Sequence, residues 1–156
     1  MVKLSGVAMI VFASVLAAGH LISQERRRVE CVEGFYLLIS LIKEQIECYS
    51  APIKKILPSC DDRIIRRLGL DQPPTDFGEI LSGCEDVLDD DSKKTLREFS
   101  STLGKSYRDV QIRTCNKALS ELDIQLKGLR AAYPARKKTV IALCAAIGGM
   151  AVIALI

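Results

Sequence analysis

Charged residues are confined to the middle of this 156-residue chain, and that distribution limits what it can fold into. Every acidic residue lies between Glu25 and Asp123, and of the 22 lysines and arginines only Lys3 lies outside residues 26–138. Two nearly uncharged ends are not expected of a uniformly polar globule or of a disordered charged tail. A charged middle of this length also excludes a channel made of many membrane spans.

Two uncharged apolar runs, one at each end, have the length of a membrane span. They cover residues 4–22 and 139–156. As helices they measure about 28 and 27 Å, close to the hydrocarbon thickness of a bilayer. For the first run a cleaved signal peptide is the alternative, with Ala17, Ala18 and Gly19 as the cleavage site. We favour a span, because the run is longer than the apolar core of a signal peptide and basic residues follow it at once.

Basic residues flank both runs on the side of the middle segment. They are Arg26, Arg27, Arg28, Arg136, Lys137 and Lys138. Positive residues beside a span stay on the cytoplasmic side of the membrane. We therefore predict an N-terminal transmembrane helix at residues 1–23, a cytoplasmic helical domain at residues 24–138 and a C-terminal transmembrane helix at residues 139–156.

Apolar positions three and four residues apart predict two long amphipathic helices in the middle segment. The first apolar stripe consists of Val32, Phe35, Ile39, Ile42, Ile46 and Tyr49. The second consists of Ile112, Cys115, Leu119, Leu122, Leu126, Leu129 and Tyr133. Each helix joins an apolar run directly, so the simplest packing is antiparallel and sets the two runs side by side. The predicted fold class is all-α, a membrane-anchored helical bundle between two transmembrane helices.

Short helices are expected between the two stripes. Ser59 is expected to cap a helix that ends at Gly69, and Thr75 or Asp76 to cap the next one. A further helix is expected to end at a left-handed Gly104.

Proline and small residues suggest details of the long helices. Pro134 is expected to kink the second one. The pairs Ala13 with Ala17 and Ala145 with Gly149, four residues apart, would let the two apolar runs approach closely.

The sequence lacks the residue sets of common catalytic, cofactor and metal sites. Gly104, Lys105 and Ser106 resemble the end of a phosphate-binding loop, but Phe99 stands where the loop's first glycine belongs and a helix is predicted in place of the required strand. The only histidine, His20, has no acidic partner within either run. We predict no enzyme, no cofactor and no metal site. The net charge of +3 gives no nucleic-acid footprint.

Six cysteines are interpreted as small apolar residues in a reducing compartment. They form no C-x-x-C pair and no zinc pattern with histidine. Free cysteine is among the most buried residue types, which agrees with a cytoplasmic middle domain. They are Cys31, Cys48, Cys60, Cys84, Cys115 and Cys144.

The segment that starts at Leu96 resembles a family signature. LREFSSTLGKSY, followed by a glutamine, is similar to the L-x-x-F-x-x-x-L-G-x-S-D segment of the stage III sporulation protein AB family. Tyr107 stands where the family has aspartate. The likeness extends to the apolar ends, the basic residues after the first run, a break at residues 50–52 and the glycine pair in the last run. The motif positions taken as candidates for partner binding are Leu103, Gly104, Ser106 and Gln111.

The resemblance implies a role in endospore formation. Family members belong to a complex in the mother-cell membrane around the engulfed forespore, and their cytoplasmic domain is similar to that of platform protein F of type II secretion and type IV pilus systems. By that analogy the middle domain would dock a cytoplasmic ATPase, stage III sporulation protein AA, and hydrolyse nothing itself. The bilayer, other channel subunits and further copies of the chain are the other expected partners.

Two other functions are compatible with the same sequence. A membrane-anchored helical scaffold of another secretion or cell-division complex agrees with the composition equally well. A small membrane enzyme or transporter subunit agrees less well, because site residues and ionisable groups within the spans are missing. Residues 103–111 and the acidic stretch at residues 85–91 are the candidate docking surfaces, although capping or solvated roles explain both segments equally well.

Overall fold

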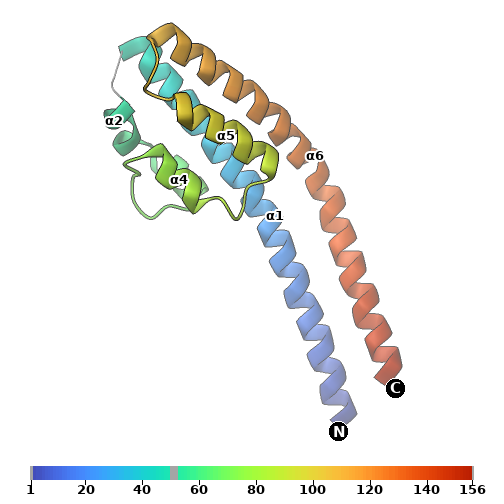
Figure 1. Cartoon of the computed structure of the whole chain (residues 1–156). Coiled ribbons are helices and arrows are strands. Elements are labelled where there is room, and N and C mark those ends of the chain that lie inside the picture. Colours follow the sequence, from blue (N-terminus) through green and yellow to red (C-terminus); the bar gives the residue numbers. More distant parts are fainter. Residues whose placement is uncertain (1, 50–52, 156) are drawn as a thin grey trace. The chain divides into compact units, whose positions relative to one another are not determined.

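The computed structural model describes residues 2–49 and 53–155, and the part it describes is helical, without a strand. The all-α prediction is therefore confirmed. In chain order the elements are α1 (Val2–Tyr49), α2 (Ile53–Ile56), the 3₁₀ turn η1 (Leu57–Ser59), α3 (Asp62–Leu68), α4 (Phe77–Gly83), α5 (Asp90–Thr102) and α6 (Arg108–Leu155), as Figure 1 shows.

The chain divides into two compact units. One, here called the bundle unit, is Arg28–Gly128. The other, the helix-pair unit, combines Met1–Arg27 with Leu129–Ile156. Helices α1 and α6 each contribute residues to both units, so each predicted amphipathic helix continues directly into an apolar run, as expected.

Neither long helix is interrupted within its described range. Helix α6 continues through Pro134, the residue at which a kink is expected, and the proline does not end the helix. The break expected at residues 50–52 lies outside the described residues. In the described part of the chain, no helix has both the length and the apolar character needed to cross a membrane. Several side chains of the two apolar runs lie outside the described part, and the two spans remain a prediction.

The predicted apolar stripes form the core of the bundle unit. Buried positions include Val32, Phe35, Ile39, Ile42 and Ile46 of α1 and Cys115, Leu122 and Leu126 of α6. The ring of Phe77 on α4 lies 5.8 Å from that of Phe35 and 5.2 Å from that of Phe99 on α5, centroid to centroid. Aromatic pairs at such separations add attraction beyond the burial of their area. One short helix and one α5 side chain thus close the core over α1.

A glycine brings α3 close to α1. A Cβ atom on Gly34 would lie 3.1 Å from the side chain of Leu68, tighter than ordinary van der Waals contact. On the same two helices the Arg67 guanidinium forms an ion pair with the Glu33 carboxylate. The lack of a side chain at Gly34 therefore sets how closely α3 can pack on α1.

The capping residues differ in part from those expected. Asp61 caps α3, with its carboxylate accepting a hydrogen bond from the backbone nitrogen of Arg63 at 3.0 Å. Ser59, the expected cap, donates its hydroxyl hydrogen back to the carbonyl oxygen of Ile56 at 2.9 Å, so that prediction is wrong. Asp61, which lies nearer the helix start, caps α3 in its place. Gly69 follows the last residue of α3 and adopts the left-handed conformation, with φ 71°.

Of the two residues expected to cap α4, Asp76 is the one that does so. The carboxylate of Asp76 accepts a hydrogen bond from the backbone nitrogen of Gly78 at 3.2 Å, which makes Asp76 the cap. The Thr75 hydroxyl donates instead to the Glu79 carboxylate, one turn along the helix.

The helix-pair unit consists of the first part of α1 and the last part of α6, running antiparallel. Arg136 Nη1 lies 3.0 Å from Glu25 Oε1, and a Cβ atom on Gly148 would lie 3.3 Å from Ser14 Oγ. Moving toward lower numbers on α1 therefore means moving toward higher numbers on α6. The expected side-by-side arrangement of the two runs is confirmed within this unit.

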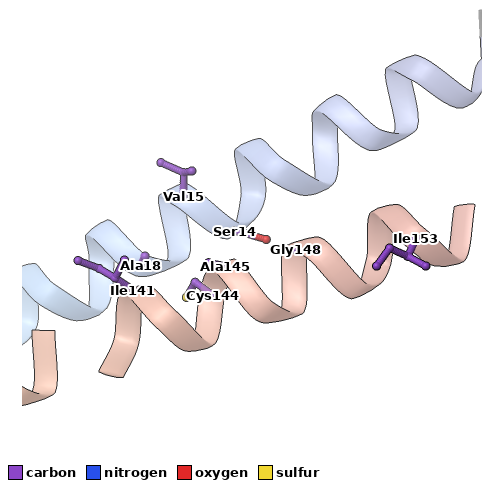
Figure 2. A pocket seen from close by; sticks show the side chains of 9 residues that line it. Ser14, Val15, Ala18, Ile141, Cys144, Ala145, Gly148 and Ile153 are labelled. Carbon is purple, nitrogen blue, oxygen red and sulfur yellow. The ribbon is translucent and has the colours of Figure 1, made fainter. Parts of the chain in front are cut away.

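Small residues face each other across this pair, although not all of those predicted. Figure 2 shows the apolar groove, with a volume of about 670 Å³. It is lined by Ser14, Val15, Ala18, Ile141, Cys144, Ala145, Gly148, Gly149 and Ile153. Ala145 and Gly149 are among these residues, as expected, but Ala13 and Ala17 are exposed outside the groove. The rotation of α1 places Ser14 and Ala18 in the groove instead.

Candidate docking surface at the α5–α6 junction

The turn between α5 and α6 depends on a glycine. After the last residue of α5, Leu103 adopts an extended conformation, and its backbone nitrogen donates to the carbonyl of Phe99 at 3.0 Å. Gly104 follows with φ 77°. This left-handed conformation is strained for residues that have a Cβ atom. The predicted glycine cap is confirmed, and the helix before it excludes the strand that a phosphate-binding loop needs.

The two other motif residues shape the start of α6. The Gln111 side chain donates from Nε2 to the carbonyl oxygen of Ser106 at 2.7 Å. Its backbone nitrogen donates to the carbonyl of Tyr107 at 3.0 Å. Gln111 thereby holds the last residues of the turn against the first turn of the helix. The motif accordingly has a structural role at this junction.

Arg108 joins this junction to the end of α1. Its Nε donates to the carbonyl oxygen of Ile46 at 3.1 Å, and its guanidinium also donates to the carbonyl of Glu47. Both carbonyls belong to the last turn of α1, where no further helical N–H groups follow to bond them. A cation at a helix C-terminus is favourable because the partial charge there is negative.

An apolar surface is exposed beside this anchored turn. Tyr107 is 89% exposed, and Val110, in the first turn of α6, is 45% exposed. We call these two residues the junction surface. Tyrosine is frequent among the side chains that dominate binding energy in protein interfaces. In the sequence, Tyr107 stands where the family signature has aspartate, and its exposure could not be known from the sequence.

A buried polar network fixes α5 against α6. The Ser92 hydroxyl, with none of the residue exposed, donates to Gln125 Oε1 at 2.9 Å. The Thr95 hydroxyl donates to Glu121 Oε2 at 2.9 Å, and Gln125 Nε2 donates to Thr95 Oγ1 at 3.4 Å. Buried polar groups with partners hold helices in one register, since any shift would leave them unpaired. The helix periodicity did not predict this network.

An ion pair lies at the solvent-exposed edge of the interface between α5 and α6. Lys117 Nζ lies 3.0 Å from Glu98 Oε2. The hydrogen bond and charge of Lys117 lower the pKa of Glu98 below its ordinary value, and those of Glu98 raise the pKa of Lys117. Both residues line an open polar groove of about 460 Å³ between α5 and α6.

The acidic stretch at residues 85–91 makes intramolecular contacts. Glu85 forms an ion pair with Arg97, and the carbonyl of Val87 accepts from Arg28 Nε at 3.1 Å. Asp90 and Asp91 lie in the first turn of α5, where negative charge is favourable. Among the described residues, no group of three or more histidine, cysteine, aspartate or glutamate side chains could hold a metal ion. These contacts favour the junction surface over the acidic stretch for docking.

The cysteines of the bundle core are free thiols. Cys31, Cys60, Cys84 and Cys115 are buried, as interpreted from the sequence, whereas Cys48 is exposed and Cys144 is partly exposed. Burial raises the pKa of Cys115 to about 11 and raises that of Cys60. The thiols of Cys60 and Cys115 are therefore protonated at neutral pH.

The basic residues chosen as topology anchors lie in both units. Arg28, in the bundle unit, donates to Val87 as described above. Arg26, Arg27, Arg136, Lys137 and Lys138 are exposed in the helix-pair unit. Within that unit Arg136 pairs with Glu25, so the anchors of the two helices lie at the same end of the pair.

Comparison with known proteins identifies one family. The model of stage III sporulation protein AB matches residues 79–156, which is half of the chain. The match begins within α4 and includes α5, the junction and α6. No curated protein and no solved structure matches the chain.

Proposed function

The chain belongs to the stage III sporulation protein AB family, and we propose that it is a non-catalytic membrane component of the channel complex between mother cell and forespore. Family membership gives it a sporulation-related role, in a family of structural rather than enzymatic proteins. The match over residues 79–156 is the observation on which the proposal rests. The channel, the mother-cell membrane and the partners below are parts of the proposal.

In this proposal the bundle unit docks a cytoplasmic ATPase, stage III sporulation protein AA, through the junction surface. Three features support the choice of surface. It lies inside the family match, Tyr107 and Val110 are exposed, and Arg108 and Gln111 hold the backbone beneath them. A rigid support lowers the entropy lost on binding. Leu103, Gly104 and Ser106 shape the turn that presents the surface.

A binding measurement with matched variants tests the docking proposal. The full chain in detergent is immobilised, and the dissociation constant of the purified ATPase is measured for wild type, Tyr107→Ser and Val110→Ser. We expect Tyr107→Ser to weaken binding by about tenfold or more, since interface tyrosines often contribute about 2 kcal/mol. Ile124→Ser is the control, because Ile124 is 68% exposed on α6 but lies outside the junction surface. Equal weakening by Tyr107→Ser and the control Ile124→Ser would contradict the surface. No binding by folded wild type would contradict ATPase docking.

We also propose that residues 1–23 and 139–156 anchor the chain in the bilayer, with residues 24–138 cytoplasmic. The support is the absence of charge from residues 4–22 and 139–156, together with exposed large apolar side chains in the helix-pair unit, such as Phe12, Leu143 and Ile147. Contiguous exposed apolar surface marks contact with a membrane or another protein.

Cysteine labelling in protoplasts tests this topology. Cys48 is exposed and is first replaced by serine; Asp90→Cys then provides a reporter, because the Asp90 side chain is fully exposed. We expect an impermeant maleimide to label position 90 only after the membrane is permeabilised. Labelling of intact protoplasts would place the bundle unit outside. Complete release of the chain by alkaline carbonate would contradict anchoring itself.

A further inference from the structure

We propose that the helix-pair unit binds anionic phospholipid headgroups through a basic collar. The collar consists of Arg26, Arg27, Arg136, Lys137 and Lys138. This inference rests on the bilayer anchoring proposed above and adds to it the chemistry of the lipid that surrounds the chain.

The tertiary structure assembles the collar from the two ends of the sequence. Arg136 Nη1 lies 3.0 Å from Glu25 Oε1 and 3.1 Å from Glu25 Oε2, a contact between residues 111 positions apart. Glu25 directly precedes Arg26 and Arg27, and Arg136 directly precedes Lys137 and Lys138. The contact therefore brings two short basic sequences to the same level of the antiparallel pair.

The collar has more positive charge than the unit can neutralise. Glu25 is the single acidic residue of the helix-pair unit, and it is bonded to Arg136. Arg27, Lys137 and Lys138 are exposed, and within the described residues no ion pair joins any of them to a carboxylate of this unit. Their counter-ions must therefore come from outside the unit.

The surface next to the collar indicates which anion fits. Before the collar residues on α1, and after them on α6, the helices carry exposed apolar side chains, including Leu21 and Ile141. An anionic phospholipid has the same order of parts, a phosphate beside an apolar chain. A soluble phosphate or a nucleic acid would match the cations but leave the apolar side chains in water. Basic residues beside a membrane-embedded segment attract anionic lipids in this way.

Lipid selectivity tests the inference on the full chain. The protein is reconstituted in phosphatidylcholine bilayers with traces of spin-labelled phosphatidylglycerol or spin-labelled phosphatidylcholine, and the motionally restricted fraction of each label is measured. We expect wild type to prefer phosphatidylglycerol by roughly threefold to tenfold at low salt. The preference should fall toward one in the triple variant Arg27→Gln, Lys137→Gln, Lys138→Gln, and in 1 M NaCl, which screens exposed charges.

A matched variant separates the collar from total charge. Lys55→Gln, Lys94→Gln and Arg113→Gln together remove the same number of charges from exposed positions of the bundle unit and should leave the preference intact. Equal restriction of both lipids by wild type would overturn the inference while leaving bilayer anchoring in place. Loss of preference in both triple variants would also overturn it. Absence of any restricted lipid would contradict the anchoring itself.

Discussion

Arg108, the first residue of α6, donates a hydrogen bond from its Nε to the carbonyl oxygen of Ile46 in the last turn of α1, over 3.1 Å. The two residues are 62 positions apart. The contact couples the end of one long helix to the start of the other at the place where the family motif turns the chain. The orientation of the junction surface therefore depends on α1 as well as on the motif.

Removing this contact should destabilise the bundle. Arg108→Met keeps an aliphatic side chain but leaves two carbonyls of α1 without a charged donor. We expect a loss of about 1–2 kcal/mol in the free energy of unfolding. Arg113→Met, at an exposed position of the same helix, should change it by less than about 0.5 kcal/mol. Urea denaturation followed by circular dichroism measures both, and equal stability of the two variants would show that the Arg108 contact contributes nothing.

The conformation of Gly104 predicts opposite effects for two glycine substitutions. Gly104→Ala should lower the free energy of unfolding by about 1–2 kcal/mol, because φ 77° is strained for alanine. Gly128→Ala should raise it by about 0.5–1 kcal/mol, because Gly128 lies inside α6 with no atom within 4 Å of an added Cβ. A denaturation midpoint of Gly104→Ala that equals or exceeds that of wild type would contradict the assignment of Gly104 as a left-handed cap.

The buried contact between α5 and α6 should appear as a coupling energy. We expect the double-mutant cycle of Ser92→Ala and Gln125→Ala to give about 0.5–1.5 kcal/mol, because each single change removes the same 2.9 Å hydrogen bond. Pairing Ser92→Ala with Asn116→Ala, an exposed position on α6, should give a coupling near zero. Additive effects in both cycles would mean that the hydroxyl does not hold the helices in register.

The pair formed by Glu98 and Lys117 predicts a pH dependence. In the folded state Lys117 lowers the pKa of Glu98 below its ordinary value of 4.5. The ion pair therefore contributes fully to the stability of the folded state above pH 4.5, and this stabilisation is lost as pH falls through the lowered pKa. Glu98 raises the pKa of Lys117 from 10.5, so the alkaline loss begins above that pH. Wild type should therefore exceed Lys117→Met in stability at pH 7, with a difference that shrinks toward pH 2.

Solvent exposure of both side chains should keep this effect small. Lys105→Met provides the control at an exposed position of the junction. Its stability should follow that of wild type across the same acid range. A gap between wild type and Lys117→Met that stays constant from pH 7 to pH 2 would show that the ion pair is not its cause.

Much of the helical organisation follows from local patterns. The stripe from Val32 to Ile46 was predicted from spacing and is buried, because a helix places every third or fourth residue on one face. Gly104 was predicted as a left-handed helix end for a similarly local reason, the absence of a Cβ atom. The cap of α3 was placed at Ser59 instead of Asp61, since several nearby polar residues could serve and only the backbone path selects among them.

Contacts between helices required the tertiary structure. Periodicity states which face of a helix is apolar, but not its rotation or register against a neighbour. For that reason Ser14, and not Ala13, faces Gly148, and Gln125 meets Ser92. The pairing of Glu25 with Arg136 likewise depends on register. The charge distribution along the chain was enough to predict two apolar ends with a set of basic residues beside each. Only the tertiary structure showed that these two sets form one collar, because a side-chain contact depends on distance in space and not on position in the sequence.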